Sequence, residues 1–114
     1  MSNVIDSVDQ FGFLEVRSER EGDTHVIALS GELDIDGIKS VREALHAAED
    51  SDAREVVLDL TDLQFIDSSG IQLVVEADAR ARADGNRLHL RRGPEHVHRV
   101  FVLTDLADRL PFAD

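Results

Sequence analysis

The chain of 114 residues has the apolar content of an ordinary globular protein and is long enough for one compact domain but not for two. It contains no cysteine, which excludes disulfides, thiol catalysis and a thiolate zinc site. Its 24 acidic and 12 basic residues give a formal net charge of -12, which argues against binding to nucleic acid or an anionic membrane and would favour a basic partner.

The start of the chain carries no sign of export or membrane insertion. The first ten residues lack the basic flank and the apolar stretch of a secretory signal, and no apolar run is long enough to cross a bilayer. We therefore expect a cytoplasmic protein. Residues 1–12 are polar and aperiodic, and we expect them to form a flexible arm in front of a single domain at 13–114.

Two strands and a helix are predicted in the first half of the chain. Residues 14–17 alternate between apolar and polar side chains, and the turn signal at 21–23 predicts a hairpin into a second strand at 25–29. Asp36 is a candidate N-cap of the helix that follows. The apolar face of this helix would carry Ile38, Val41, Leu45 and Ala48.

Strands and helices alternate in the second half. The β-branched apolar run at 56–60 predicts a central strand that is covered on both faces. A helix from 71 to about 83 would end at Gly85, and a strand at 88–90 would precede a third helix at 95–101. The order β-β-α-β-α-β-α predicts an α/β fold, in which a mixed, mostly parallel sheet of four to five strands has helices packed against it.

A short polar junction, Asp67-Ser68-Ser69-Gly70, joins the central strand to the second helix. Open α/β sheets place functional groups at the carboxyl ends of their strands. Asp67 or Ser68 would cap the helix, and Ser69 would lie in its first turn, where free N–H groups and the helix dipole favour an anion. A phosphoryl group on Ser69 would meet those donors and also the opposing charge of Asp67, which suits a reversible switch. Taken alone, the tetrapeptide is more typical of an ordinary helix cap.

The faces of this second helix follow from its period of 100° per residue. One arc faces the sheet and contains Gly70, Leu73, Val74, Ala77 and Ala81. Ile71 and Val75 lie beside that arc, with Gln72, Glu76 and Ala79 further round. The two apolar residues would form the centre of a partner surface, or they would fill a groove against a neighbouring helix, and the sequence leaves both open.

Two motifs and a C-terminal stretch of the sequence resemble one known family. The run LDLTDLQFIDSSGI at 58–71 closely resembles the signature of the anti-sigma factor antagonists, which are bacterial members of the STAS domain family. The run GELD at 31–34 resembles the second hallmark of that family, and residues 97–112 resemble its C-terminal helix and tail. The resemblance implies a single STAS domain at 13–114.

The resemblance also implies a regulator of transcription that works by partner switching and needs no cofactor. The sequence leaves the oligomeric state open, and a monomer is the default expectation. When unphosphorylated, such a protein binds an anti-sigma factor that is also a serine kinase of the histidine-kinase-like ATPase fold, and this frees the sigma factor. The kinase phosphorylates the second serine of the motif, here Ser69, and the complex dissociates. A PP2C-type phosphatase restores the unphosphorylated form.

The family pattern assigns roles to individual residues of this chain. Asp67 and Asp34 would flank the phosphorylated Ser69, and Ser68 would shape the loop beside Gly70. The helix period, and not the family pattern, gives the expected partner surface, which consists of Ile71, Gln72, Val75, Glu76 and Ala79. Related domains act as scaffolds of stressosomes or as subunits of lipid-transport complexes, and either role would use this helix without phosphorylation. The intact serine pair favours the switch.

An enzyme is the main alternative outside this family. A Ser/His/Asp hydrolase would carry a Gly-x-Ser-x-Gly nucleophile elbow, but the residue two positions before Ser69 is Asp67. His96 and His98 are two residues apart on a predicted helix, so they would point in different directions and make a poor metal pair. We therefore expect no catalytic activity and no metal site.

Overall fold

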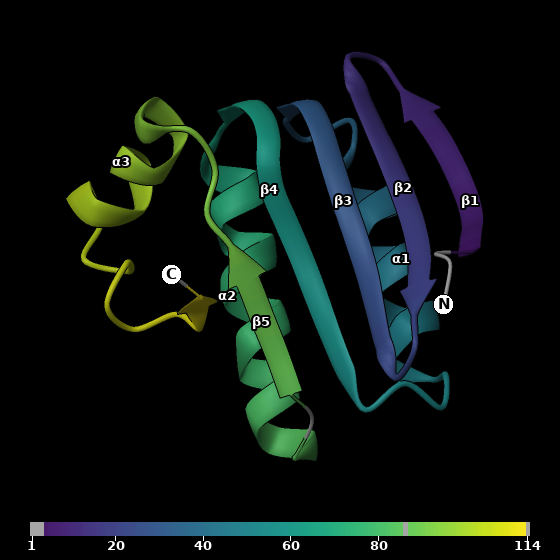
Figure 1. Ribbon diagram of the computed structural model, residues 1–114. Helices are drawn as coiled ribbons and strands as arrows, with labels where there is room; N and C mark the ends of the chain where they lie inside the picture. Colours follow the sequence, from purple (N-terminus) through teal and green to yellow (C-terminus); the bar gives the residue numbers. More distant parts are fainter. Residues whose placement is uncertain (1–3, 86, 114) are drawn as a thin grey trace.

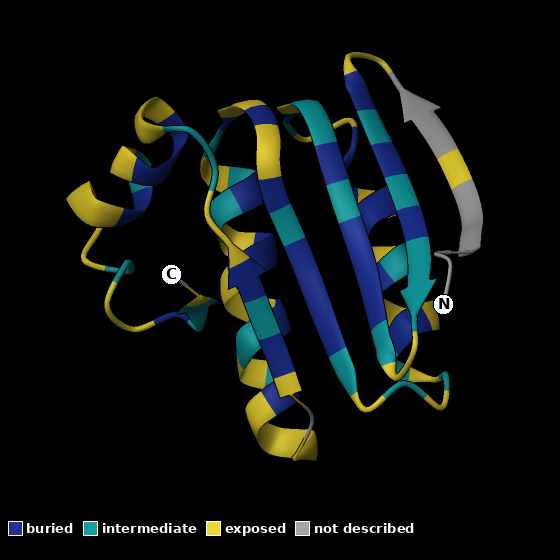
Figure 2. Cartoon of the chain, viewed as in Figure 1, coloured by how far each residue is buried: buried dark blue, intermediate teal, exposed yellow. Residues whose placement is uncertain are grey.

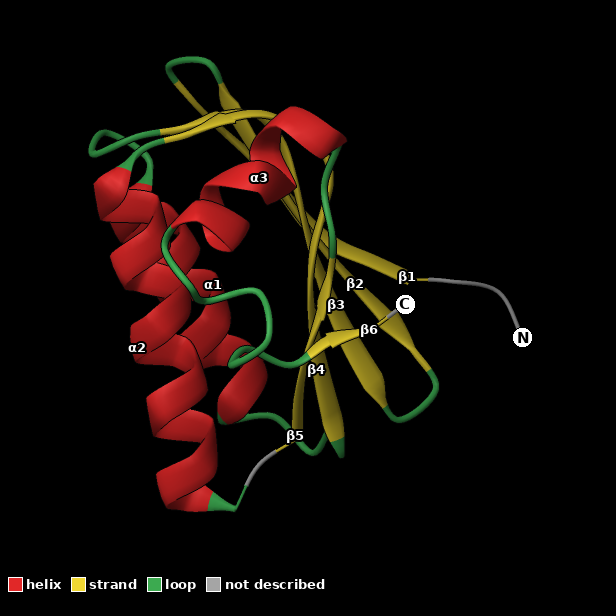
Figure 3. Cartoon of the chain, turned by 90° about the vertical axis from the view of Figure 1, so that its left-hand side faces the viewer, coloured by secondary structure: helices red, strands yellow, loops and turns green. Residues whose placement is uncertain are grey.

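The computed structural model describes residues 4–85 and 87–113. Within them, six strands form one sheet, and three helices lie on one side of it (Figure 1, Figure 3). The strands are β1 (Val4–Phe11), β2 (Leu14–Glu21), β3 (Thr24–Leu33), β4 (Glu55–Ile66), β5 (Arg87–Arg91) and β6 (Phe112–Ala113). The helices are α1 (Ile38–Glu49), α2 (Ser68–Asp84) and α3 (Glu95–Leu103).

The sheet is mixed, and its strands lie side by side in chain order from β1 to β6. β1, β2 and β3 pair antiparallel, whereas β3, β4, β5 and β6 pair parallel. This confirms the predicted α/β fold, with its mostly parallel sheet and its helices packed against it. The described sheet has six strands, whereas the sequence predicted four to five.

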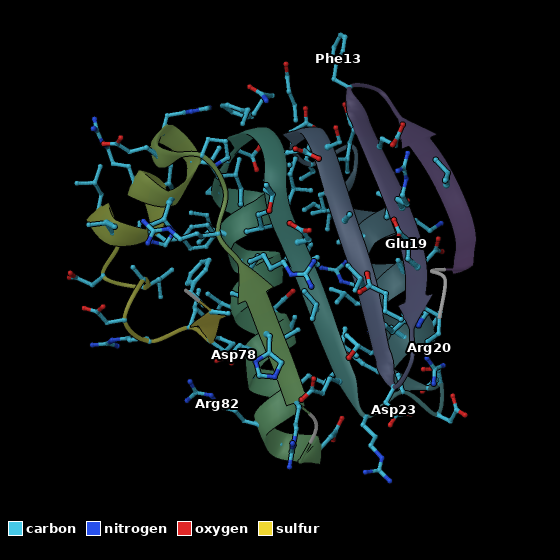
Figure 4. All side chains as sticks on the ribbon, in the orientation of Figure 1. Phe13, Glu19, Arg20, Asp23, Asp78 and Arg82 are labelled. Carbon is cyan, nitrogen blue, oxygen red and sulfur yellow. The ribbon has the colours of Figure 1, made fainter. Side chains whose placement is uncertain are left out.

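The additional strand is β1, and the prediction of a flexible arm is wrong for residues 4–11. Gly12 has a φ of 56°, a conformation that favours glycine, in the two-residue turn between the paired residues Phe11 and Leu14. An edge strand gains its backbone hydrogen bonds whatever the pattern of its side chains, so periodicity did not reveal it. Phe13 projects from this turn and is 76% exposed (Figure 4).

The main hydrophobic core lies between the sheet and the helices (Figure 2). Its fully buried side chains include Leu29, Leu58 and Leu60 from the sheet, and Leu45 and Val74 from α1 and α2. The apolar face predicted for the first helix is confirmed, because Ile38, Val41, Leu45 and Ala48 are all buried.

The second face of the sheet is also buried around the centre of β3 and β4. Val57 of β4 and its neighbour Val26 of β3 are paired in register and buried, yet they lie outside the main core cluster. Of the three described helices, none lies over this face (Figure 3). Val56, Val57 and Leu58 of β4 are all buried, so the predicted cover of this run on both faces is confirmed, although the described helices lie over one face only (Figure 3).

A separate feature of the described residues concerns membranes. Among residues 4–85 and 87–113, no helix combines the length and the apolar character that a membrane span requires.

A small aromatic cluster attaches α3 to the end of the chain. The ring of His98 meets the ring of Phe112 edge-on, with centroids 4.8 Å apart, and Phe101 and Phe112 lie 5.1 Å apart. His98 is only 7% exposed, and its Nδ1 atom has no hydrogen-bond partner among the described residues. Burial and, to a smaller extent, the positive charge of Arg92 lower the pKa of His98 below its ordinary value of 6.5.

This lowered pKa predicts that acidification destabilises the fold before the carboxylates titrate. Above pH 6.5, His98 is neutral in the folded and in the unfolded chain, so it does not change the stability. Below that pH, the unfolded chain binds a proton that the folded chain resists. The free energy of unfolding should then fall by at most about 1.4 kcal/mol per pH unit, down to the lowered pKa of the folded state.

Urea unfolding of the wild type and of His98→Phe at about pH 7.5 and about pH 5.5 tests this expectation. The variant keeps a ring at this position but removes the titration, so it should lose less stability between the two pH values than the wild type does. An equal loss in both proteins would show that His98 does not cause the pH dependence.

Candidate functional site

The candidate site lies where β3 and β4 end side by side. Leu33 and Ile66 are paired in register at the carboxyl ends of these parallel strands, and the N–H of Asp67 donates to the carbonyl of Leu33 at 3.2 Å. Asp34 and Asp67 each follow one member of this pair. The structure therefore brings together Asp34 and Asp67, one from each sequence motif, although they lie more than thirty residues apart in the chain.

Asp67 caps α2, which confirms one of the two predicted caps, Asp67 or Ser68. Its backbone is extended, with φ -103° and ψ -174°, and its Oδ1 atom accepts from the N–H groups of Ser69 at 2.9 Å and Gly70 at 3.2 Å. Ser68 is instead the first residue of the helix and is exposed. One expectation is corrected here: a phosphoryl group on Ser69 would not find these two N–H donors free, because the Asp67 carboxylate already occupies both.

Asp36, by contrast, does not cap α1. The N-cap residue of that helix is Gly37, and no described side chain makes a capping hydrogen bond there. The N–H of Asp36 donates to the Oδ1 atom of Asp34 at 3.0 Å, and the N–H of Gly37 donates to the carbonyl of Asp34 at 3.1 Å. Asp34 thus organises the turn between β3 and α1, since both its side chain and its backbone accept within that turn.

Gly70 allows α2 to approach the strand ends closely. A Cβ atom at this position would lie 2.7 Å from Cγ1 of Ile66 and 3.0 Å from Cδ2 of Leu33, both of which belong to buried core side chains. The absence of a side chain therefore sets the position of the first turn of α2, and with it the position of Ser69.

Ser69 is half-buried and lines a surface groove of about 380 Å³ between α1 and α2, which we call the Ser69 groove. α2 contributes Gln72 and Glu76 to it. The other side consists of Ile35 in the preceding turn and of Ile38, Lys39 and Arg42 in α1. An ion pair crosses the groove between Arg42 Nη2 and Glu76 Oε1, which are 3.2 Å apart.

Of the five residues predicted as a partner surface, two line the Ser69 groove. These two are Gln72 and Glu76. Ile71 is half-buried and packs against the core, whereas Val75 and Ala79 are exposed. The sequence left open that Ile71 and Val75 fill a groove against a neighbouring helix. In the structure, neither residue lines the groove between α1 and α2.

The cations of the groove were missed at the level of the sequence. Lys39 and Arg42 lie about thirty residues before Ser69, and nothing in their local pattern connects them to it. One signal was available, because Lys39 is the only lysine of the chain.

The histidines give no indication of a metal centre. His98 is buried against Phe112, whereas His96 is exposed and its Nε2 atom lies 2.7 Å from the carbonyl oxygen of Gln64. Across residues 4–85 and 87–113, no group of three His, Asp or Glu side chains is arranged to hold a metal ion.

Removing the Asp67 cap should destabilise the protein by about 1 kcal/mol, because two N–H groups at the start of α2 lose their acceptor. Urea unfolding of Asp67→Ala measures this loss. Asp36→Ala is the matched control, since Asp36 stands at the start of the other helix but does not cap it. Equal stability of the two variants would show that the cap contributes nothing.

The chain is similar to a protein-family model and to several known proteins. A family model described as "Mlab, STAS domain" matches residues 16–111. An anti-sigma-B factor antagonist of Listeria monocytogenes is 30% identical over 90 residues, which is 79% of this chain and 79% of the relative.

Two solved structures of one protein are also similar to this chain. The anti-sigma factor antagonist SpoIIAA in its unphosphorylated form is 26% identical with a TM-score of 0.68, and the match covers 87% of this chain and 88% of SpoIIAA. The phosphorylated form of the Bacillus cell fate determinant SpoIIAA is 27% identical with a TM-score of 0.66, over 87% of this chain and 91% of that chain.

Proposed function

The chain belongs to the STAS domain family, and from this membership we propose that it is a cytoplasmic anti-sigma factor antagonist controlled by phosphorylation of Ser69. In its unphosphorylated form it binds an anti-sigma factor that is also a serine kinase of the histidine-kinase-like ATPase fold, and the sigma factor is released. The kinase inactivates it by phosphorylating Ser69, and a PP2C-type phosphatase reverses this step. The chain itself catalyses no reaction and requires no cofactor.

The observation that carries this proposal is the position of Ser69. The residue lies in the first turn of α2 and lines an open groove, so its side chain borders a surface that a second protein can contact. Asp67 and Gly70 fix that turn against the ends of β3 and β4. A hydroxyl held on a rigid element beside a partner surface suits modification by another protein's active site.

Electrostatics explains why phosphorylation would end the interaction. A phosphoryl group carries about -1.5 to -2 charges at neutral pH. On Ser69 it would stand close to the Asp67 carboxylate, whose Oδ1 atom lies 2.9 Å from the backbone nitrogen of Ser69. Placing this extra charge in an interface costs desolvation and adds repulsion against any acidic group of the partner.

Two experiments test the proposal. A pull-down from cell lysate with the wild type should recover a small protein of the ATPase fold, and Ser69→Asp should not recover it. Incubation of the purified partner with ATP and this chain should add one phosphate, and mass spectrometry should map it to Ser69. A phosphate found only on Thr61 or Thr104 would exclude the assignment.

The alternative role, as a scaffold or lipid-transport subunit that is not phosphorylated, leads to different outcomes. Such a subunit would use the surface of α2 without the Ser69 hydroxyl, so Ser69→Ala and Ser69→Asp would recover the same partners as the wild type. Recovery of a membrane transporter complex by all three proteins would favour this role over the switch.

A further inference from the structure

A phosphoryl group on Ser69 would need a counter-charge that the start of α2 does not supply. The nearest backbone donors, the N–H groups of Ser69 and Gly70, both donate to Oδ1 of Asp67. Since that oxygen belongs to a carboxylate, the added dianion would meet repulsion at this end of the helix. A positive counter-charge within the chain must therefore come from another element.

Two cations of α1 share the Ser69 groove. Lys39 and Arg42 are three residues apart, which places them on the same face of the helix, and both line the groove with Ser69. Long, flexible side chains can reorient across a groove of about 380 Å³. The arrangement thus offers two positive charges to one new dianion.

The direction of the helices places Lys39 toward Ser69. Arg42 contacts Glu76 and Glu49 contacts Arg80, so residue numbers increase in the same direction along α1 and α2. Lys39 precedes Arg42 by about one helical turn and lies on the Ser69 side of the Arg42–Glu76 pair. Glu76 itself is seven residues beyond Ser69, or about 10 Å along the axis.

The Arg42–Glu76 pair is suited to exchange. It is a single contact of 3.2 Å, and about 44% of the Arg42 side chain and 45% of the Glu76 side chain remain exposed. Exposed ion pairs of this kind contribute little to stability. Arg80, by contrast, makes two hydrogen bonds of 2.9 Å to Glu49 and begins about 16 Å along α2 from Ser69.

We propose that Lys39 and Arg42 form a phosphate cradle within the chain, which binds the phosphoryl group of phosphorylated Ser69 after Arg42 leaves Glu76. This inference rests on the proposed function, because it assumes that Ser69 is the modified residue. It adds that the modification rearranges the groove and does more than place a charge in it. Glu76 loses its cationic neighbour, so its carboxylate becomes an unpaired negative charge on the α2 side of the groove.

The cradle can be tested without knowing the kinase. Phosphoserine is installed at position 69 by genetic code expansion in the full chain, and the second pKa of the phosphate is measured by phosphorus NMR. Nearby cations favour the dianion and therefore lower this pKa. We expect the phosphate pKa to rise by about one unit in the Lys39→Gln/Arg42→Gln double variant, and by less in each single variant.

Arg80→Gln is the matched control, since it also removes a cation that bridges α1 and α2 but lies outside the Ser69 groove. It should leave the phosphate pKa unchanged. The same phosphate pKa in the wild type and in the double variant would overturn the cradle. Equal shifts in the double variant and in Arg80→Gln would overturn it too, because they would reflect the net charge of the chain.

The outcome separates the cradle from the proposed function. If phosphoserine at position 69 abolishes partner binding but the double variant does not change the phosphate pKa, the switch stands and the cradle is wrong. If the pKa shifts but phosphoserine leaves partner binding unchanged, the contact exists and the proposed function fails.

Discussion

Replacing Gly31 with alanine should lower the free energy of unfolding by about 3 kcal/mol or more. Gly31 has a φ of 101°, which side chains of L-residues strongly disfavour, and a Cβ atom there would overlap with the carbonyl oxygen of Phe13. That oxygen belongs to the backbone and accepts from the N–H of Glu32 at 2.9 Å. The new methyl group would therefore force β2 away from β3 near the end that carries Asp34.

Urea unfolding compares this variant with Gly22→Ala, which serves as the matched control. Gly22 also has a positive φ, of 62°, but a Cβ atom there would meet no heavy atom within 4 Å. Its replacement should cost only about 1 kcal/mol from backbone strain. Similar losses in the two variants would mean that the close approach to Phe13 does not determine the stability.

Ser69→Asp should weaken binding to the anti-sigma partner by about a hundredfold, which corresponds to about 2.7 kcal/mol. The added carboxylate imitates part of the phosphate charge beside Asp67 and within the Ser69 groove. Isothermal titration calorimetry with the partner recovered from lysate measures the change. Ser69→Ala should bind as tightly as the wild type and resist inactivation by the kinase.

Ser69→Asn separates charge from size, because it has nearly the shape of Ser69→Asp but no charge. We expect Ser69→Asn to lose much less affinity than Ser69→Asp. Equal losses would show that bulk in the groove disrupts the complex, and the electrostatic explanation of the switch would then be wrong. Wild-type affinity in Ser69→Asp would exclude any role of charge at this residue.

The start of α2 was predictable because a helix cap is a local interaction. The Asp67 carboxylate accepts from the N–H groups two and three residues further along the chain, and this contact requires nothing from the rest of the fold. The same reasoning failed for Asp36, which also precedes an apolar helical stripe. There the carboxylate of Asp34 takes the local role by accepting from the N–H of Asp36, and the helix begins one residue later.

The edge strand β1 shows a second limit of sequence patterns. A strand in the middle of this sheet must bury apolar side chains against the helices, so β4 carries a continuous apolar run that the sequence displays. β1 only has to offer its backbone to β2 across the turn at Gly12. Backbone pairing is open to nearly any residue, and the segment therefore looked like an arm.

The sequence by itself determined the order of strands and helices from β2 onward, the cap of α2 to within one residue and the family to which the chain belongs. These features depend on hydrophobic periodicity, on interactions within a few residues and on two motifs that are recognised from the identity and order of their residues. Only the tertiary structure decided which residues surround Ser69. Lys39 and Arg42 reach the groove because the chain crosses from β3 to β4 through α1, and such contacts between distant residues leave no periodic trace in the sequence.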